Sequence, residues 1–317
     1  GFHFNQKLKI IKTNAFNSVS FETSVVLSFP DSLEQIEDCA FFNANDIIMI
    51  NFGEKSNIKR IDYAAFSLSE IKKAEISSIN KDIEFGTCCF YNCPNLLEVD
   101  LSNTFLTKIP TSCFMLCASL EDIRLPITIT EINNEAFKST HLEKFVFPPN
   151  LKSIGIRAFA YSDLKEIMIP SDCTISYIDA EAFSHNALKT IPINLLENLS
   201  FCGTSAFQDN NFTKLTLYPP KEKTVLRKLV FSNNIKLEYV SLENNKYSWS
   251  KVPEKMFFSC SKLKSISTPD TLTEIGPFSF AQTGFSEITF SSLKKISSAA
   301  FADCKNLEKI DLSKAPL

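Results

Sequence analysis

One segment of this 317-residue chain shows most clearly how the chain folds, and it reads Leu120-Glu-Asp-Ile-Arg-Leu-Pro-Ile-Thr-Ile-Thr-Glu-Ile-Asn-Asn-Glu-Ala-Phe137. Its apolar residues Ile123 and Leu125 alternate with polar ones, which predicts a short strand with one buried face. Pro126 follows at once and ends the strand, because proline has no N–H for a ladder. The Ala136-Phe137 pair at the end of the stretch begins a segment whose spacing predicts one short helical turn, with the Phe137 ring pointing into the core.

The same features recur along the whole chain at intervals of 21 to 26 residues, with a mean near 24. A unit of this length cannot bury its apolar face alone, whereas stacked units share a continuous core. We therefore expect a parallel sheet and a spine of rings, with the rest of each repeat as the return. The recurring rings, called slot phenylalanines below, are Phe16, Phe41, Phe66, Phe90, Phe114, Phe137, Phe159, Phe183, Phe207, Phe231, Phe257, Phe280 and Phe301.

Composition excludes several classes of protein. The chain is 44% hydrophobic and has 7 glycines, so it is neither disordered nor collagen-like. Its formal net charge of −3 argues against a nucleic-acid partner, which would require a basic face. No apolar run approaches the roughly 18 residues of a membrane-spanning helix, so we expect no membrane insertion by this segment.

Glycine is concentrated in one position of the repeat. Gly86, Gly155, Gly203 and Gly276 each lie four residues before a slot phenylalanine. This predicts a turn with positive φ in those repeats. Pro110 shares the position and cannot adopt positive φ, so the turn is not uniform.

The repeat runs without a linker or a low-complexity segment, so we expect residues 1–317 to form a single domain. The repeats begin almost at the first residue and continue nearly to Leu317 without a divergent cap. Solenoids normally need polar caps. The expectation is therefore a fragment of a longer protein.

The quoted stretch resembles the BspA-like leucine-rich repeats, whose pattern reads Leu-x-x-Ile-x-Ile-Pro-x-x-Val-x-x-Ile-Gly-x-x-Ala-Phe-x-x-Cys. Residues 151–170 and 272–304 are similar, and the resemblance covers essentially the whole chain. It departs from the pattern where glycine is missing in most repeats and where Cys202 replaces isoleucine. The resemblance implies a right-handed α/β leucine-rich-repeat solenoid with a concave parallel sheet, short helical turns on an irregular convex side, and about 13 repeats.

Most of the ten cysteines fall in core positions of the repeat. Cys93, Cys117, Cys260 and Cys304 lie three residues after a slot phenylalanine, where free cysteine acts as a small hydrophobe. The alternative is a disulfide or a zinc site, because stacking would bring one group of thiols within reach of each other. That group is Cys89, Cys93, Cys113 and Cys117.

Catalytic and cofactor motifs are missing from the sequence. It contains no His-Glu-x-x-His, no Gly-x-Ser-x-Gly and no phosphate-binding glycine loop, so we expect no enzyme, no metal and no cofactor. His141 and His185 fall in exposed turns, and the single tryptophan, Trp249, falls in a core position. Asn198 and Asn211 start Asn-x-Ser/Thr sequons and are candidate glycosylation sites if the chain is secreted.

The candidate binding surface consists of strand residues that point away from the core. Twelve such pairs run from Met49 and Asn51 to Lys309 and Asp311, with one at Thr190 and Pro192. They include five basic and seven acidic residues of mixed order. A mixed, moderately polar row fits a protein partner. We expect the partner to contact two neighbouring patches first. The most acidic patch consists of Glu98, Asp100, Asp122 and Arg124, and the most apolar patch consists of Lys144, Val146, Glu166 and Met168.

The sequence therefore predicts a non-enzymatic, protein-binding solenoid. The family resemblance implies a cell-surface or extracellular protein that attaches to host cells, host matrix or other microbes, with a host matrix or host-cell surface protein as partner. The alternative is a cytoplasmic scaffold with the same fold, which the core cysteines permit.

Overall fold

The computed structural model describes residues 3–192, 195–218, 224–242 and 249–313. The chain divides into two compact units, which are described separately. Unit 1 comprises residues 1–163 and 169–174, and unit 2 comprises residues 164–168 and 175–317. The expectation of one domain stays a prediction.

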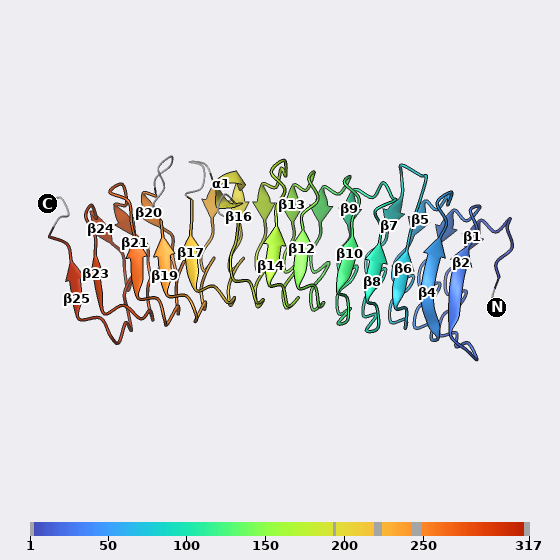
Figure 1. Ribbon diagram of the computed structural model, residues 1–317, viewed down its shortest axis with the longest axis horizontal. Coiled ribbons are helices and arrows are strands. Elements are labelled where there is room, and N and C mark those ends of the chain that lie inside the picture. The colour runs from blue at the N-terminus through green and yellow to red at the C-terminus, as the bar shows by residue number, and fades with distance from the viewer. Residues whose placement is uncertain (1–2, 193–194, 219–223, 243–248, 314–317) are drawn as a thin grey trace. The chain divides into compact units, whose positions relative to one another are not determined.

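Unit 1 winds through two kinds of parallel strand (Figure 1). The first kind, the outer strands, carries the predicted alternation: β2 (Val25–Phe29), β4 (Ile47–Phe52), β6 (Lys73–Glu75), β8 (Glu98–Asp100), β10 (Asp122–Arg124) and β12 (Lys144–Val146). The second kind consists of two-residue strands on another side of each repeat: β1 (Ile10–Ile11), β3 (Gln35–Ile36), β5 (Arg60–Ile61), β7 (Glu84–Phe85), β9 (Lys108–Ile109), β11 (Glu131–Ile132) and β13 (Ser153–Ile154).

Unit 2 repeats this arrangement. Its outer strands are β14 (Glu166–Met168), β17 (Lys214–Thr216), β19 (Tyr239–Ser241), β21 (Ser265–Ser267), β23 (Glu287–Thr289) and β25 (Lys309–Asp311). Its two-residue strands are β15 (Tyr177–Ile178), β16 (Phe201–Cys202), β18 (Val225–Leu226), β20 (Lys251–Val252), β22 (Glu274–Ile275) and β24 (Lys295–Ile296). The strand predicted between Thr190 and Pro192 is not formed. The chain instead enters the short helix α1 (Leu195–Asn198), and the Leu195 N–H donates to the Pro192 carbonyl at 2.9 Å.

The ladders are parallel and nearly in register from one repeat to the next. In unit 1 the outer strands form one sheet in the order β10-β8-β6-β4-β2, and the short strands form the ladders β1-β3-β5-β7 and β9-β11-β13. In unit 2 the outer strands form β17-β19-β21 and β23-β25. The short strands of unit 2 form β15-β16-β18 and β20-β22-β24.

The slot phenylalanines form the predicted spine. Phe41, Phe66 and Phe90 of unit 1 are each fully buried, and successive rings stack with centroids 5.1 and 5.3 Å apart. In unit 2 the rings of Phe183 and Phe207 stack at 5.4 Å. Near-parallel rings at these separations are offset-stacked, a favourable arrangement of aromatic quadrupoles. The spine therefore combines large apolar burial with specific ring geometry.

The segment around each slot phenylalanine is a hydrogen-bonded turn that is not helical, whereas the sequence predicted one short helical turn. In every repeat the residues two before and two after the ring have positive φ, as at Asn14 (58°) and Ser18 (56°) around Phe16. The N–H groups of Asn14, Phe16 and Ser18 donate to main-chain carbonyls of the next repeat, at 3.1, 2.7 and 2.7 Å. We call this stack of five-residue segments the turn column. Positive φ interrupts a right-handed helix, which explains the difference.

The prediction of positive φ at the glycine position is wrong, because no described glycine has positive φ. The glycines are needed for close approach between repeats. A Cβ at Gly86 would lie 2.4 Å from the Tyr63 nitrogen, and one at Gly203 would lie 2.3 Å from the Ala180 nitrogen. Both separations are far shorter than any real Cβ contact, so a larger residue requires the backbone to shift.

Candidate functional site

Six of the predicted surface residues come together on the outer strands of unit 1. Glu98 and Asp100 of β8 lie directly beside Asp122 and Arg124 of β10. Lys144 and Val146 are carried by β12, and Val146 is 55% exposed. We call the outward side chains of β6, β8, β10 and β12 the outer-strand surface. The remaining two residues, Glu166 and Met168, lie on β14 in unit 2, and both are exposed.

The cations of the outer-strand surface are shared between carboxylates. Lys73 Nζ lies 3.0 Å from Glu75 Oε1 and 3.2 Å from Glu98 Oε2, and these contacts raise the lysine pKa. Arg124 Nη1 lies 3.4 Å from Asp100 Oδ2, and its Nε lies 3.6 Å from Asp122 Oδ2. Such exposed pairs contribute little stability. Strands β6, β8 and β10 together carry two basic and four acidic outward side chains, so this part is net acidic.

A groove lies between β10 and β12. Its volume is about 440 Å³, and its rim carries Glu121, Asp122, Arg124 and Lys144 from the charged rows. The sequence pattern did not predict a surface role for most of the apolar residues that line the groove, because it places them in the core or at strand ends. These residues are Ile123, Leu125, Phe145, Phe147, Pro148, Pro149 and Pro170.

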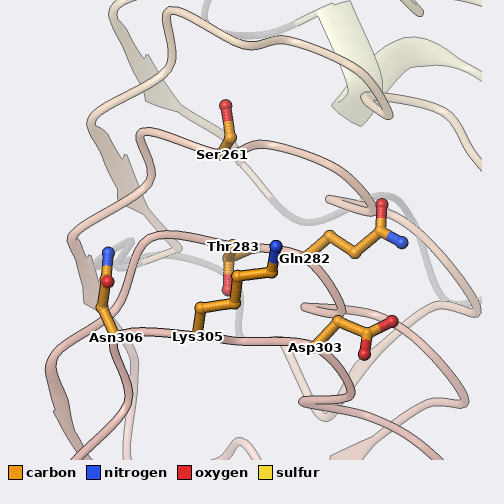
Figure 2. Close-up of a pocket in the computed structure, with 6 residues that line it drawn as sticks. All are labelled: Ser261, Gln282, Thr283, Asp303, Lys305 and Asn306. Atoms are coloured by element: carbon orange, nitrogen blue, oxygen red, sulfur yellow. The ribbon is translucent and has the colours of Figure 1, made fainter.

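A second hollow, of about 670 Å³, lies beside the turn column of unit 2 (Figure 2). Phe285 follows Phe280 by five residues, whereas Leu263 and Leu307 follow their slot phenylalanines by six. The middle turn is one residue shorter, and a Cβ at Gly284 would lie only 2.4 Å from the Ser261 carbonyl oxygen. The lining is polar and shallow: Ser261, Gln282, Thr283, Asp303, Lys305 and Asn306.

The predicted core positions of Trp249 and most of the cysteines are confirmed, whereas Cys304, also predicted in the core, is half-buried. Cys89, Cys93, Cys113 and Cys117 are fully buried, and Trp249 is 3% exposed with its Nε1–H donating to the Leu217 carbonyl at 3.0 Å. The described residues contain no group of three or more His, Cys, Asp or Glu side chains that could hold a metal ion. Burial raises the pKa of the Cys202 thiol to about 12, which keeps this thiol protonated and unreactive at neutral pH.

Cysteine also has a polar role that the sequence did not reveal. The Cys117 thiol donates to the Phe90 carbonyl at 3.0 Å, and the Cys93 thiol donates to the Phe66 carbonyl at 3.1 Å. A hydroxyl and an amide do the same at this position in other repeats, where Ser162 donates to the Phe137 carbonyl and Asn234 to the Phe207 carbonyl. In most repeats this position therefore holds a small side chain that can donate a hydrogen bond, although Ala44 occupies it in one repeat.

Both histidines of the turns pair with an aspartate of the following repeat. His141 Nδ1 lies 2.9 Å from Asp163 Oδ2, and His185 Nδ1 lies 2.7 Å from Asp209 Oδ2. These pairs are partly exposed, as predicted for turn residues. Of the two candidate glycosylation sites, Asn198 is exposed at the end of α1 and Asn211 is half-buried.

This geometry defines a leucine-rich-repeat solenoid, with an exposed row of side chains on stacked parallel strands. The chain belongs to the BspA-type leucine-rich repeat family. The family model described as "BspA type Leucine rich repeat region (6 copies)" matches residues 1–106, 75–189, 157–251 and 225–315. The recognition made from the sequence is thus confirmed, and no curated protein matches the chain.

Several solved structures are similar to this chain. A leucine-rich repeat protein from Bacteroides ovatus is 19% identical, with 90% of this chain and 80% of that chain covered and a TM-score of 0.48. A leucine-rich cell surface protein from Faecalibacterium prausnitzii is 20% identical, with 95% and 92% covered and a TM-score of 0.44. The pneumococcal vaccine antigen PcpA is 16% identical, with 97% and 72% covered and a TM-score of 0.43.

Across the described residues, no helix is both long and apolar enough to cross a bilayer.

Proposed function

We propose that this chain is a non-enzymatic, protein-binding solenoid and the adhesive ectodomain of a cell-surface protein. The observation that supports it is the outer-strand surface, where exposed charges of both signs adjoin the exposed apolar side chain of Val146. Protein interfaces combine these elements, with a polar rim around apolar anchors. The attachment targets that we propose are host cells, host matrix or other microbes, following the role implied by the BspA-like family.

The test uses beads coated with the full chain, applied to cultured epithelial monolayers and to wells coated with extracellular matrix. The variant carries Glu98→Lys, Asp100→Lys and Asp122→Lys together. We expect adhesion to fall severalfold, because reversal of charges at an interface slows encounter and places like charges opposite each other.

The matched control carries Glu254→Lys, Asp270→Lys and Glu308→Lys, three exposed positions of unit 2 outside the predicted surface row, with the same change in net charge. This control should adhere like the unmodified chain. Equal adhesion of all three proteins would remove the outer-strand surface of unit 1 from consideration. Absence of adhesion by the unmodified chain would contradict the adhesive role.

A second candidate, a cytoplasmic scaffold, is favoured by one observation: cysteines persist as thiols most readily in a reducing compartment, and six of the ten are buried in the core as free thiols. Labelling of intact source cells with an antibody against the folded chain separates the two. Staining without permeabilisation supports the ectodomain, and staining only after permeabilisation supports the scaffold.

A further inference from the structure

The outer sheet of unit 1 opens at one place, between β10 and β12. Within the described residues of unit 1, β10 has β8 as its strand partner, and no ladder joins it to β12. The other two sides of the same repeats remain closed. Ile109 and Ile132 pair in the β9-β11 ladder, and the rings of Phe114 and Phe137 stack at 5.4 Å. The opening is therefore local to the outer strands, which Figure 1 draws further apart here than at β8 and β10.

The open edge presents main-chain groups. The Asp122 N–H donates to the Leu97 carbonyl at 3.2 Å, and the Leu101 N–H donates to the Arg124 carbonyl at 2.8 Å. In a parallel strand the next residue directs its N–H and C=O to the opposite edge, so the main chain of Ile123 faces β12. Unpaired strand edges are templates for another extended chain.

The groove also exposes the apolar interior. Ile123 is half-buried, whereas the equivalent Val99 of β8 is 2% exposed and Phe145 of β12 is 4% exposed. Three of the residues that line the groove are Pro148, Pro149 and Pro170. Proline offers an apolar surface with no N–H donor, so this part of the lining suits an apolar side chain of an incoming segment.

The charges around the groove indicate which residues of the partner lie beside its apolar side chain. The two cations of β6 and β10, Lys73 and Arg124, are each shared by two carboxylates. The surface on the β8 side of the groove is thus acidic, and Glu121 adds a further carboxylate at the rim. A partner with basic residues beside its apolar anchor is complementary to this surface.

We propose that the groove between β10 and β12 binds an extended polypeptide segment of a protein partner, with one aromatic or β-branched residue inserted against Ile123 and Pro148 and with lysine or arginine next to it. The segment forms main-chain hydrogen bonds to the edge of β10, a form of strand addition. The inference rests on the proposed protein-binding function and names the chemistry of the partner.

The test is selection of linear peptides from a random 12-residue display library on the full chain. We expect enriched peptides to place an aromatic or β-branched residue beside lysine or arginine. Synthetic copies should lose about tenfold or more in affinity for the Val146→Lys variant, which puts bulk and positive charge at the groove. The matched variant Ile235→Lys changes an apolar side chain of unit 2 that is as exposed as Val146, and it should bind the peptides with the affinity of the unmodified chain.

Hydrogen exchange supplies a readout of the binding mode. The Ile123 amide should exchange slowly only when peptide is present, whereas the Val99 amide, already in a ladder, should not change. Enrichment of no peptide, enrichment of acidic peptides, full affinity for Val146→Lys or an unprotected Ile123 amide would each overturn the proposal. A chain that adheres to cells but fails these tests overturns the groove alone, whereas one that passes them without adhering overturns only the adhesive role.

Discussion

Individual residues of the turn column adopt a backbone conformation that L-amino acids normally avoid. The residue two before the ring is Cys39, Ala64 or Leu229 in different repeats, and all three have positive φ. A left-handed conformation costs such residues roughly 1–2 kcal/mol each. The hydrogen bonds to the next repeat and the stacked rings offset this cost, so the conformation is imposed by the neighbours and does not depend on side-chain preference.

Gln282 offers a test at this scale, because it has a φ of 61° and is exposed. We expect Gln282→Gly to unfold at higher urea than Gln282→Val, with a difference of about 2 kcal/mol in the free energy of unfolding. The same pair of substitutions at Thr289, an exposed residue of β23, should give the reverse order, because strands favour valine over glycine. If the same variant is the more stable one at both sites, the left-handed conformation of residue 282 does not determine the stability of these variants.

Residue identity explains why these turns were not predictable. The sequence signals for positive φ are glycine and asparagine, and they led to the glycine position, where φ is ordinary. The residues that do adopt positive φ vary too much in type to form a signal. By contrast, the slot phenylalanines and core cysteines were predictable, because burial selects residue type directly.

Among the elements, the outer strands were predictable and the two-residue strands were not. Alternation over three or more residues has a period that can be read, as in Ile123 and Leu125. A strand such as Lys108–Ile109 is too short for any period to show, although its apolar residue recurs in the sequence. The turn column was missed as a third hydrogen-bonded element for a similar reason, since its bonds join different repeats.

The turn column also needs buried donors, and Asn234 is the clearest case. Its Nδ2 donates to the Phe231 and Phe207 carbonyls at 2.7 and 3.2 Å, and its Oδ1 accepts from the Asn210 N–H at 2.8 Å. In the variant Asn234→Leu, the two phenylalanine carbonyls and the Asn210 N–H lose the amide as a hydrogen-bond partner at a fully buried position. We expect it to lower the free energy of unfolding by about 2–4 kcal/mol, measured by urea denaturation.

The matched variant is Asn234→Cys, which installs the residue that Cys117 and Cys260 provide at the same position. A thiol retains one donor to the preceding carbonyl, so this variant should lose clearly less stability than the leucine variant. Equal losses would mean that volume, rather than hydrogen bonding, decides the residue at this position.

For the molecule as a whole, the repeat and its family could be predicted because many positions recur together. The groove could not, since it depends on how two strands are placed. Ile123 and Phe145 are 22 residues apart and their strands are unpaired, yet Ile288 and Ile310 are also 22 apart and are paired. Repeat length therefore does not predict where a ladder opens.

The expectation of a single domain has a direct consequence for unfolding. The stability of a repeat protein is the sum of the intrinsic stability of each repeat and the stability of its interfaces with neighbouring repeats. Repeats that fold as one domain therefore unfold together. Phe90 lies in unit 1, and Trp249, the only tryptophan, is buried in unit 2 and reports on that unit by fluorescence. Phe90→Leu should destabilise by about 1–2 kcal/mol through lost ring contacts. We expect the urea midpoint seen by Trp249 to fall with the midpoint seen by far-ultraviolet circular dichroism.

Phe231→Leu, within unit 2, is the control, and it must lower the urea midpoint that Trp249 fluorescence reports. If Phe90→Leu leaves that signal at its original midpoint while part of the dichroism is lost earlier, the two units unfold independently and the single domain is contradicted.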